Sequence, residues 1–576
     1  MHTTHWICGY DDLDRLHSAI RAILRRHPNL RIINAFYPLK ERPEGLETTY
    51  YRDYLSQQDE IPLFARAYKD AGAMLALARQ RSSLSAALFS VALHDIALHL
   101  FDHLVYQHVQ AHAAEDTLFI SRHRRLSLRG FIRPFMEMNR EMPQTVDPRD
   151  TTLRLAPLDD LEDPVVIVSD DSGTRVNAST YLPLIKSLAA QGGQPVFMGM
   201  NASSCDEVKT LGHATCSLAS PPLCDRKTYR AVLRDCADII SRVLFGDARL
   251  RRVMGDYRLG GYNATGLGFL SLTALEILWL TTGHTPRAVY TDAALQTLKA
   301  RGARKIVAVN ESLGSCSLAV EVGRLHGFTS YGLSTILYMR HPTCRHFPAD
   351  HHYVYGRQLT EIMLDCGIAP DRIHEVGSYH FDRARHRVQE DDAKLCDALL
   401  PERAGRPLVI IATECRPKQH LEIEPTLAAL AERDDILTVL KLHPSEVAAP
   451  FEEMLARLGN PSHIILVGQC DTLALVANAD VLVTMGSNLI VEAAVLGTPS
   501  ISYNYTGAPC PIDFVHEGLC LGATTPEECL RLIEGIAVRG EAYDKAMALL
   551  ENVTRFNAVN DGMFIERMTA AIIAKP

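Results

Sequence analysis

The sequence has little of what marks the most easily recognised protein classes. Its 576 residues include only 2 tryptophans, and basic residues are outnumbered, with 59 Lys+Arg against 68 Asp+Glu and a formal net charge of −9. This balance excludes a general nucleic-acid binder, which needs net positive charge on its contact surface. A composition of 47% hydrophobic and 22% charged residues is typical of a folded globular protein and excludes extensive disorder.

Paired cysteine motifs are absent. The 14 cysteines contain no C-x-x-C spacing, which excludes a zinc knuckle and a thioredoxin-type redox pair. We expect reduced, mostly buried thiols in a reducing compartment. The opening residues MHTTHW lack the basic-then-apolar order of a secretion signal, so the sequence predicts a cytoplasmic protein.

No apolar run reaches the roughly 20 uninterrupted residues of a membrane-spanning helix. The run 83–106 is interrupted by histidines and aspartates, and the run 266–282 is short and contains Glu276. Both runs are predicted to be buried helices. Peripheral contact with the inner face of a membrane stays open.

Several nucleotide and catalytic motifs are also missing. The sequence has no P-loop, no G-x-S-x-G nucleophile motif, and no G-x-G-x-x-G after a strand, so NAD binding is not supported and we expect no cofactor. Asp95, His99 and His103 share one helical face, but no H-E-x-x-H accompanies them. We interpret them as polar residues of a helix face and expect no metal site.

The first 160 residues are predicted to be mostly helical and irregular. The segment 11–26 has helical spacing with acidic residues in its first turn, and the short runs 31–37 and 117–121 are β-like. The stretch 143–164 is rich in acidic residues and proline and indicates a linker.

From residue 164 onward, short apolar runs alternate with helical segments, which is the rhythm of a parallel sheet. The predicted strands are 165–168, 195–200, 305–309, 335–338 and 353–355, followed by 408–412, 437–442, 464–467, 481–484 and 500–503. Continuous apolar strands indicate sheets covered by helices on both faces. The sequence therefore predicts an α/β protein with two doubly wound Rossmann-like domains facing a cleft: a helical region at 1–160, and domains at 161–400 and 401–576.

Two motifs follow predicted strands of the C-terminal domain. His443-Pro444 ends one strand, and Gly486-Ser487-Asn488 lies between another strand and a helix. A Gly-Ser turn at a helix N-terminus offers N–H groups, a hydroxyl and the positive end of the helix dipole, which together suit a phosphate. His443 can donate a proton as a leaving group departs. A structural turn and an N-cap are the alternative interpretations.

These motifs resemble the GT-B glycosyltransferases of bacterial surface-polysaccharide synthesis. The likeness is to the group of bacterial sialyltransferases, Kdo transferases and CDP-glycerol glycerophosphotransferases, which carry a His-Pro motif and a later serine motif. The segment 356–382, ending in Val-Gly-Ser and an Asp, is similar to the inter-domain stretch of that family.

The resemblance implies roles for individual residues. His443 would contact the donor phosphate, Ser487 and the N–H groups around Asn488 would hold it, and Glu492 would meet the donor ribose. Thr413, after the first strand of the domain, is a further donor-site candidate. Asn488 stands where the sialyltransferases have a second Ser or Thr, so CMP- and UDP-linked donors both stay open.

An inverting transfer needs a base for the acceptor hydroxyl. Asp171, with Asp170 beside it, follows the first strand of the N-terminal domain and matches an acidic loop of the sialyltransferases; an N-capped turn is the alternative. Glu311 is the second candidate base. His341 and His351 are loop candidates for donor or acceptor contact.

The sequence thus predicts a metal-independent glycosyltransferase that moves a sugar, such as a nonulosonic acid, from a nucleotide-activated donor to a glycan or glycoprotein acceptor. Three alternatives stay open: a nucleotide-sugar 2-epimerase, a polyol-phosphate transferase, and a catalytically silent binding module.

Overall fold

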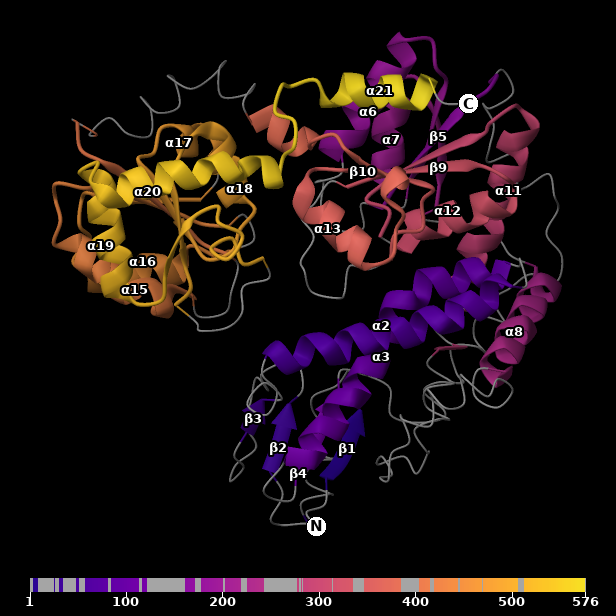
Figure 1. The fold of residues 1–576 in the computed structure, drawn as a ribbon, viewed down its shortest axis with the longest axis horizontal. Coiled ribbons are helices and arrows are strands. Elements are labelled where there is room, and N and C mark those ends of the chain that lie inside the picture. The colour runs from indigo at the N-terminus through magenta and orange to yellow at the C-terminus, as the bar shows by residue number, and fades with distance from the viewer. Residues whose placement is uncertain are drawn as a thin grey trace. The chain divides into compact units, whose positions relative to one another are not determined.

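Figure 1 shows the fold in a computed structural model of the chain. It describes residues 4–8, 25, 31–34, 48–50, 57–80, 84–112, 117–121, 161–170, 178–199, 202–218, 225–242, 277–278, 281, 283–312, 314–334, 346–384, 403, 405–414, 419–443, 446–468, 470–505 and 512–574. For some residues inside helices and strands, only the backbone is described.

Two long helices dominate the N-terminal region, as predicted. They are α2 (Gln57–Arg79) and α3 (Leu84–His112), and they pack against each other. The apolar run at 83–106 is thus largely helix α3, whose described apolar side chains are mostly buried. The predicted helix at 11–26 lies outside the described residues apart from Arg25.

A small parallel sheet of order β1-β4-β2-β3 accompanies these helices. Its strands are β1 (Thr4–Cys8), β2 (Arg31–Asn34), β3 (Thr48–Tyr50) and β4 (Thr117–Ser121). Strands β2 and β4 fall on the two predicted β-like runs, whereas β1 and β3 carry no apolar periodicity strong enough to predict them.

The first large sheet has seven strands in the order β11-β10-β9-β8-β5-β6-β7. Its strands are β5 (Val165–Ser169), β6 (Pro195–Gly199), β7 (Ala214–Ser217), β8 (Lys305–Val309), β9 (Thr329–Leu333), β10 (His351–Val354) and β11 (Ile373–Glu375). The connecting helices are α6 (Ala178–Ala190), α7 (Ala202–Thr210), α8 (Arg226–Ser241), α11 (Thr285–Ala300), α12 (Gly314–Leu325) and α13 (Arg357–Asp365).

The second large sheet has six parallel strands in the order β14-β13-β12-β15-β16-β17. They are β12 (Leu408–Ala412), β13 (Leu437–Lys441), β14 (Ile464–Val467), β15 (Val481–Thr484), β16 (Ser500–Tyr503) and β17 (Leu521–Ala523). Its helices are α15 (Gln419–Ala431), α16 (Ala449–Arg457), α17 (Thr472–Ala477), α18 (Leu489–Leu496), α19 (Pro526–Ala537), α20 (Glu541–Leu549) and α21 (Phe564–Ala574).

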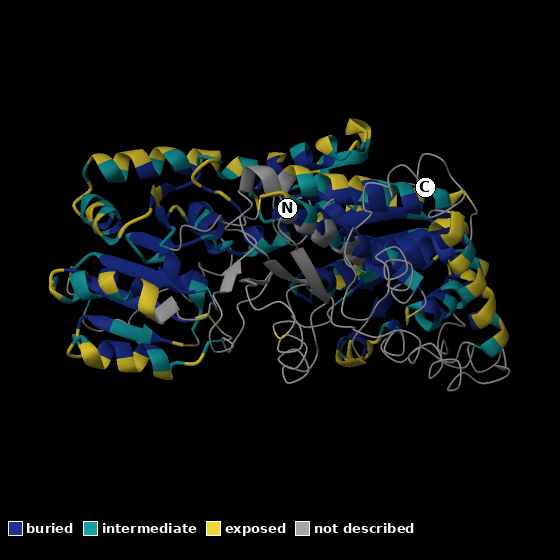
Figure 2. Ribbon diagram, turned by 90° about the horizontal axis from the view of Figure 1, so that it is seen from below, coloured by how far each residue is buried: buried dark blue, intermediate teal, exposed yellow. Residues whose placement is uncertain are grey.

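Both large sheets are doubly wound, as the sequence predicts. In each, the chain builds outward from the first strand, returns to that strand's other side and continues outward, so the winding direction reverses between β5 and β8 and between β12 and β15. Strands such as β5 and β12 are buried along their whole length because helices cover both sheet faces, and Figure 2 shows the interior of both sheets mostly in dark blue. Ligands of such sheets bind at the reversal point, beyond the carboxyl ends of the strands.

Most predicted strands are confirmed, several to the residue. The predicted strand at 335–338 lies outside the described residues, and the strand in that part of the sheet is β9, which ends at Leu333. Four further strands were not predicted: β7, β9, β11 and β17. They are short and contain Gly, Ser or charged residues, so they lack a continuous apolar run.

By contacts, the chain divides into two compact units. One comprises Met1–Leu333 and His341–Asp350, and the other comprises Ser334–Arg340 and His351–Pro576. Domain limits at residues 160 and 400 therefore stay a prediction.

None of the helices in the described part of the chain combines the length and apolar character that a membrane crossing requires.

A buried carboxylate holds the helical hairpin of the first unit to its sheet. Glu321 of α12 is only 4% exposed, and it pairs with Arg79 at the end of α2 and with Arg324, at 2.7 Å. The Ser90 hydroxyl of α3 donates to the same carboxylate at 3.4 Å. One buried group thus links α2, α3 and α12, whose apolar residues share one core.

Removal of this charge is predicted to destabilise the first unit. Glu321→Gln keeps the shape of the side chain but leaves two partly exposed arginines facing a neutral group, and the loss of a hydrogen bond to a charged group costs about 2 kcal/mol. We expect a clear drop in the midpoint of the unfolding transition of the first unit, measured by thermal or urea denaturation. The control is Asp206→Asn, which removes an exposed pair with Lys209 and is expected to cost about 0.5 kcal/mol. Equal effects of the two variants would contradict this role of Glu321.

Candidate functional site

The candidate site is the carboxyl edge of the six-stranded sheet. Thr413 and Glu414 follow β12, His443 follows β13, and Ser487 follows β15. Since β12 lies between β13 and β15, the strands that precede His443 and Ser487 are two strand spacings apart, or about 10 Å. The two predicted motifs share one edge, but they are not on neighbouring strands. In the chain, β14 lies between β13 and β15, whereas in the sheet the strand between them is β12, and the sequence does not show this order.

Thr413 supports the loop that carries His443. Its hydroxyl donates to the Glu446 carboxylate, and the backbone N–H of His443 donates both to Thr413 Oγ1 and to Glu446 Oε2, each at 2.9 Å. Thr413 is buried, whereas His443 is exposed. The hydrogen bonds therefore fix the backbone after β13 and leave the imidazole accessible to a ligand.

The predicted phosphate seat is formed at the N-terminus of α18. The Ser487 hydroxyl accepts from the Leu489 N–H at 3.3 Å, although the N-cap residue of α18 is Asn488, whose side chain makes no capping hydrogen bond. Among the described residues, the backbone N–H groups of Ser487 and Asn488 make no hydrogen bond. These two donors at the positive end of a helix remain available to an anion.

A carboxylate already occupies part of this seat. Glu414 Oε1 accepts from the Gly486 N–H at 2.6 Å, across the reversal point between β12 and β15. A bound phosphate must therefore displace the Glu414 carboxylate or use the donors of Ser487 and Asn488 beside it. The sequence analysis missed Glu414, although its position directly after a buried strand is the available signal.

Glu492 of α18 is paired with a residue that the sequence analysis did not single out. Its carboxylate is 8% exposed, and its Oε1 lies 2.6 Å from Nε2 of His380. Glu492, which is expected to contact the donor ribose, thus has a histidine beside it. The sequence signal was the likeness of segment 356–382, which ends two residues after His380.

The segment 376–384 is held by the end of the chain. Gly377 has a φ of 82°, a left-handed conformation that suits glycine, and the Ser378 N–H donates to Asn557 Oδ1 at 2.9 Å. Buried Asp382 accepts from the Phe564 N–H at 3.2 Å, and burial raises the pKa of its carboxyl group, an effect that Arg567 opposes. Gly377, Ser378 and Asp382, which belong to the segment that resembles the inter-domain stretch of the family, therefore position the part of the chain that carries His380.

A buried lysine lies beneath the His443 loop. Lys441 is 5% exposed, and its Nζ donates to the Leu442 carbonyl at 2.5 Å. Burial lowers the pKa of its ammonium group, while the nearby Cys470 and Glu446 act in the opposite direction. Burial of an ammonium group is unfavourable, which is why its pKa is lowered. Where the group is charged, it supplies positive potential at the sheet edge at which an anion would bind.

The first unit has its own candidate carboxylates at the corresponding reversal point. Asp170, after β5, accepts from the Ser315 N–H of α12 at 3.2 Å and is half-buried. Glu311, after β8, is fully buried; its Oε2 accepts from the Ala349 N–H at 2.9 Å, and its carboxylate fills the space beside Gly332. A base must reach the hydroxyl that it deprotonates, so the position of Glu311 favours a structural role and Asp170 is the better placed of the two.

The remaining candidates are less informative. His351 opens β10 in a half-buried position, with its ring 5.7 Å from that of His374. Asp171, His341 and Pro444 lie outside the described residues. Within the described part of the chain, no cluster of three or more His, Cys, Asp or Glu side chains is arranged to hold a metal, and the side chains of Asp95, His99 and His103 are not in that part.

Replacement of Lys441 is predicted to stabilise the fold. Lys441→Met keeps the length of the side chain and removes a buried charge, so the free energy of unfolding should be unchanged or higher at pH 7. Because the folded-state pKa is below the unfolded value of 10.5, the advantage of the variant should shrink as the pH rises towards 10.5. Urea unfolding at several pH values measures this difference. The matched control is Lys186→Met on the exposed face of α6, and a larger loss of stability for Lys441→Met than for the control would contradict the prediction.

Part of the chain, including this edge, matches a known protein family. Residues 343–508, under half of the chain, match the family described as UDP-N-acetylglucosamine 2-epimerase. The motifs had suggested the sialyltransferase and Kdo transferase group, and the match is to a different family with nucleotide-sugar chemistry. No curated protein sequence matches the chain.

Solved structures similar to this chain include two epimerases and one transferase. The UDP-GlcNAc 2-epimerase from Neisseria meningitidis bound to UDP-GlcNAc has 11% identity and a TM-score of 0.47, covering 72% of this chain and 100% of its own. A glycosyltransferase from Rickettsia africae (12%, TM-score 0.44) and the UDP-GlcNAc 2-epimerase from Methanocaldococcus jannaschii (12%, TM-score 0.43) have the same two coverages. At these identities and TM-scores, the likenesses support no inference about function.

Proposed function

We propose that this chain is an enzyme that binds a UDP-linked sugar at the carboxyl edge of the six-stranded sheet and changes the configuration of that sugar at C2. The supporting observation is that the segment matching the 2-epimerase family, residues 343–508, contains the whole polar edge, from His380 through Thr413 and His443 to Glu492. The reversal point of the sheet, where such folds bind ligands, lies within the same segment.

Different residues of this edge suit different parts of the ligand. The N–H groups of Ser487 and Asn488 and the dipole of α18 suit the diphosphate. Buried Glu492, oriented by His380, suits a ribose hydroxyl, since a carboxylate accepts strong hydrogen bonds from hydroxyl groups. His443 is exposed on a fixed backbone and suits proton transfer near the leaving phosphate.

Epimerisation at C2 needs no second substrate. One group removes the C2 proton while the C1–O bond to UDP breaks, which leaves a C1=C2 double bond; a proton then returns to the opposite face of C2 as UDP re-forms the C1–O bond, so the nucleotide sugar keeps its formula and no oxidant or reductant is consumed. The reaction therefore requires only the nucleotide sugar and water.

Glycosyl transfer is the second candidate. The His443-Pro444 and Gly486-Ser487 motifs at one sheet edge favour it, because both lie where charge develops on a departing nucleotide. In that case the donor is a UDP- or CMP-linked sugar and the acceptor is a glycan or glycoprotein. Peripheral attachment to a membrane would then serve access to the acceptor.

Product analysis is predicted to separate these reactions. Incubation with UDP-GlcNAc alone in D₂O should give a second UDP-sugar that carries deuterium at C2, detected by proton NMR. Free UDP that forms only after a glycan acceptor is added would instead establish transfer. Binding of UDP without any turnover of UDP- or CMP-sugars would identify a silent module; UDP at about 100 times its Kd should still stabilise the fold by about 2.7 kcal/mol.

His443 is predicted to matter for turnover more than for binding. His443→Asn should lower kcat by about 100-fold, because a positioned acid or base contributes a factor of this size, and should change the Kd of UDP by less than about threefold. The matched control is His516→Asn, another exposed histidine of the same unit. Turnover is measured by NMR and binding by calorimetry. Full activity of His443→Asn, or an equal loss in the control, would remove His443 from the mechanism.

A further inference from the structure

Helix α8 of the first unit is strongly amphipathic. Its buried face consists of Tyr229, Val232, Cys236, Ile239 and Ile240. The Asp225 side chain caps its N-terminus by accepting from the Thr228 N–H at 2.8 Å. Asp235 accepts from the Ser85 hydroxyl of α3 at 2.6 Å, and the helix packs on α3 and α11. One side of α8 is thus fixed to the protein.

The opposite side of α8 is a basic stripe. It consists of Arg226, Lys227, Arg230 and Arg234. At about 100° per residue these four side chains fall within an arc of about 100°. The sequence from 226 to 234 contains no acidic residue, although the chain as a whole has a net charge of −9. The concentration of four positive charges on one arc is therefore a local feature and does not reflect the composition.

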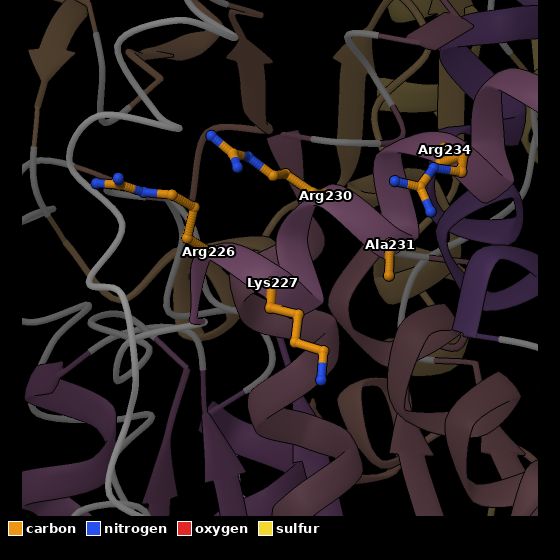
Figure 3. A pocket seen from close by; sticks show the side chains of 5 residues that line it. All are labelled: Arg226, Lys227, Arg230, Ala231 and Arg234. Atoms are coloured by element: carbon orange, nitrogen blue, oxygen red, sulfur yellow. The ribbon is translucent and has the colours of Figure 1, made fainter.

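The basic stripe lines a hollow. Its volume is about 540 Å³, and the described residues around it are the four cations and Ala231, all from α8 (Figure 3). This volume lies within the range of small-molecule sites. A hollow of this kind admits a compact ligand, whereas a flat basic face would serve a membrane surface or a long polyanion.

The chemistry of the stripe suits phosphate groups. An arginine offers planar, paired N–H donors that match two phosphate oxygens, and arginines at i, i+4 and i+8 repeat this arrangement along the helix. Like charges at i, i+4 spacing repel each other, and a bound anion relieves that repulsion.

We propose that the hollow along α8 binds a small soluble ligand that carries a diphosphate group, at a site separate from the phosphate seat at Ser487. The inference does not depend on the reaction proposed for the chain, since it rests on the first unit alone. A solvated basic face and a contact with anionic lipid are the competing interpretations.

Calorimetric titration of the full chain with inorganic pyrophosphate tests the proposal. The informative pair of variants is Arg230→Gln in the stripe and Arg242→Gln, which lies at the end of the same helix and pairs with Asp238. Each removes one positive charge. We expect pyrophosphate to bind about tenfold more weakly to Arg230→Gln and unchanged to Arg242→Gln, because a charge-assisted hydrogen bond contributes about this factor. Thermal unfolding of both variants checks that each is folded.

The other outcomes overturn the proposal. Equal titrations of wild type and Arg230→Gln would mean that pyrophosphate binds only elsewhere, such as at Ser487, and that the stripe is solvated. Equal weakening in both variants would indicate long-range attraction without a site. Co-sedimentation with phosphatidylglycerol vesicles that depends on Arg230, without a pyrophosphate effect, would replace the soluble ligand with a lipid surface. None of these results bears on the 2-epimerase assay.

Discussion

Burial of parallel strands on both faces is the constraint on which this structure depends. Strands such as Val165–Ser169 and Leu408–Ala412 are buried throughout, and their side chains are apolar apart from Ser169 at the end of the first. Polar groups are therefore displaced to the strand ends, where the sheets stop and helices begin. Asp170, Thr413, Glu414 and His443 all stand at such ends, and the winding order of each sheet determines which of them become neighbours.

The proposed ligand edge is unusual in holding several carboxylates. Glu414 binds the Gly486 N–H, Glu446 binds the His443 N–H, and Glu492 faces His380. Each of these contacts holds backbone or side-chain groups in place before a ligand arrives, which is how a site is preorganised. The buried ammonium of Lys441 opposes part of this negative charge. A diphosphate that enters the site therefore competes with internal anions for the same donors.

Sequence patterns predicted the fold better than the site. Long apolar strands such as Val481–Thr484 were found to the residue, whereas the short strand β11, with its charged residues, gave no signal. His443 and Ser487 were found because each belongs to a local motif. Glu414 and His380 were missed because their importance comes from strand order and from a partner about 70 to 110 residues away. Local patterns carry no information about such pairing.

The return of the chain's end to the middle of its second unit has a consequence for biosynthesis. Residues 377–382 take hydrogen bonds from or give them to Asn557 and Phe564, and Tyr355 accepts from the Ala558 N–H. A ribosome makes these partners roughly 180 residues after the segment that needs them. His380 and the surroundings of Glu492 thus acquire their final form only after Asn557 and Phe564 have been made, so a nascent chain that stops short of them carries a sheet without its finished edge.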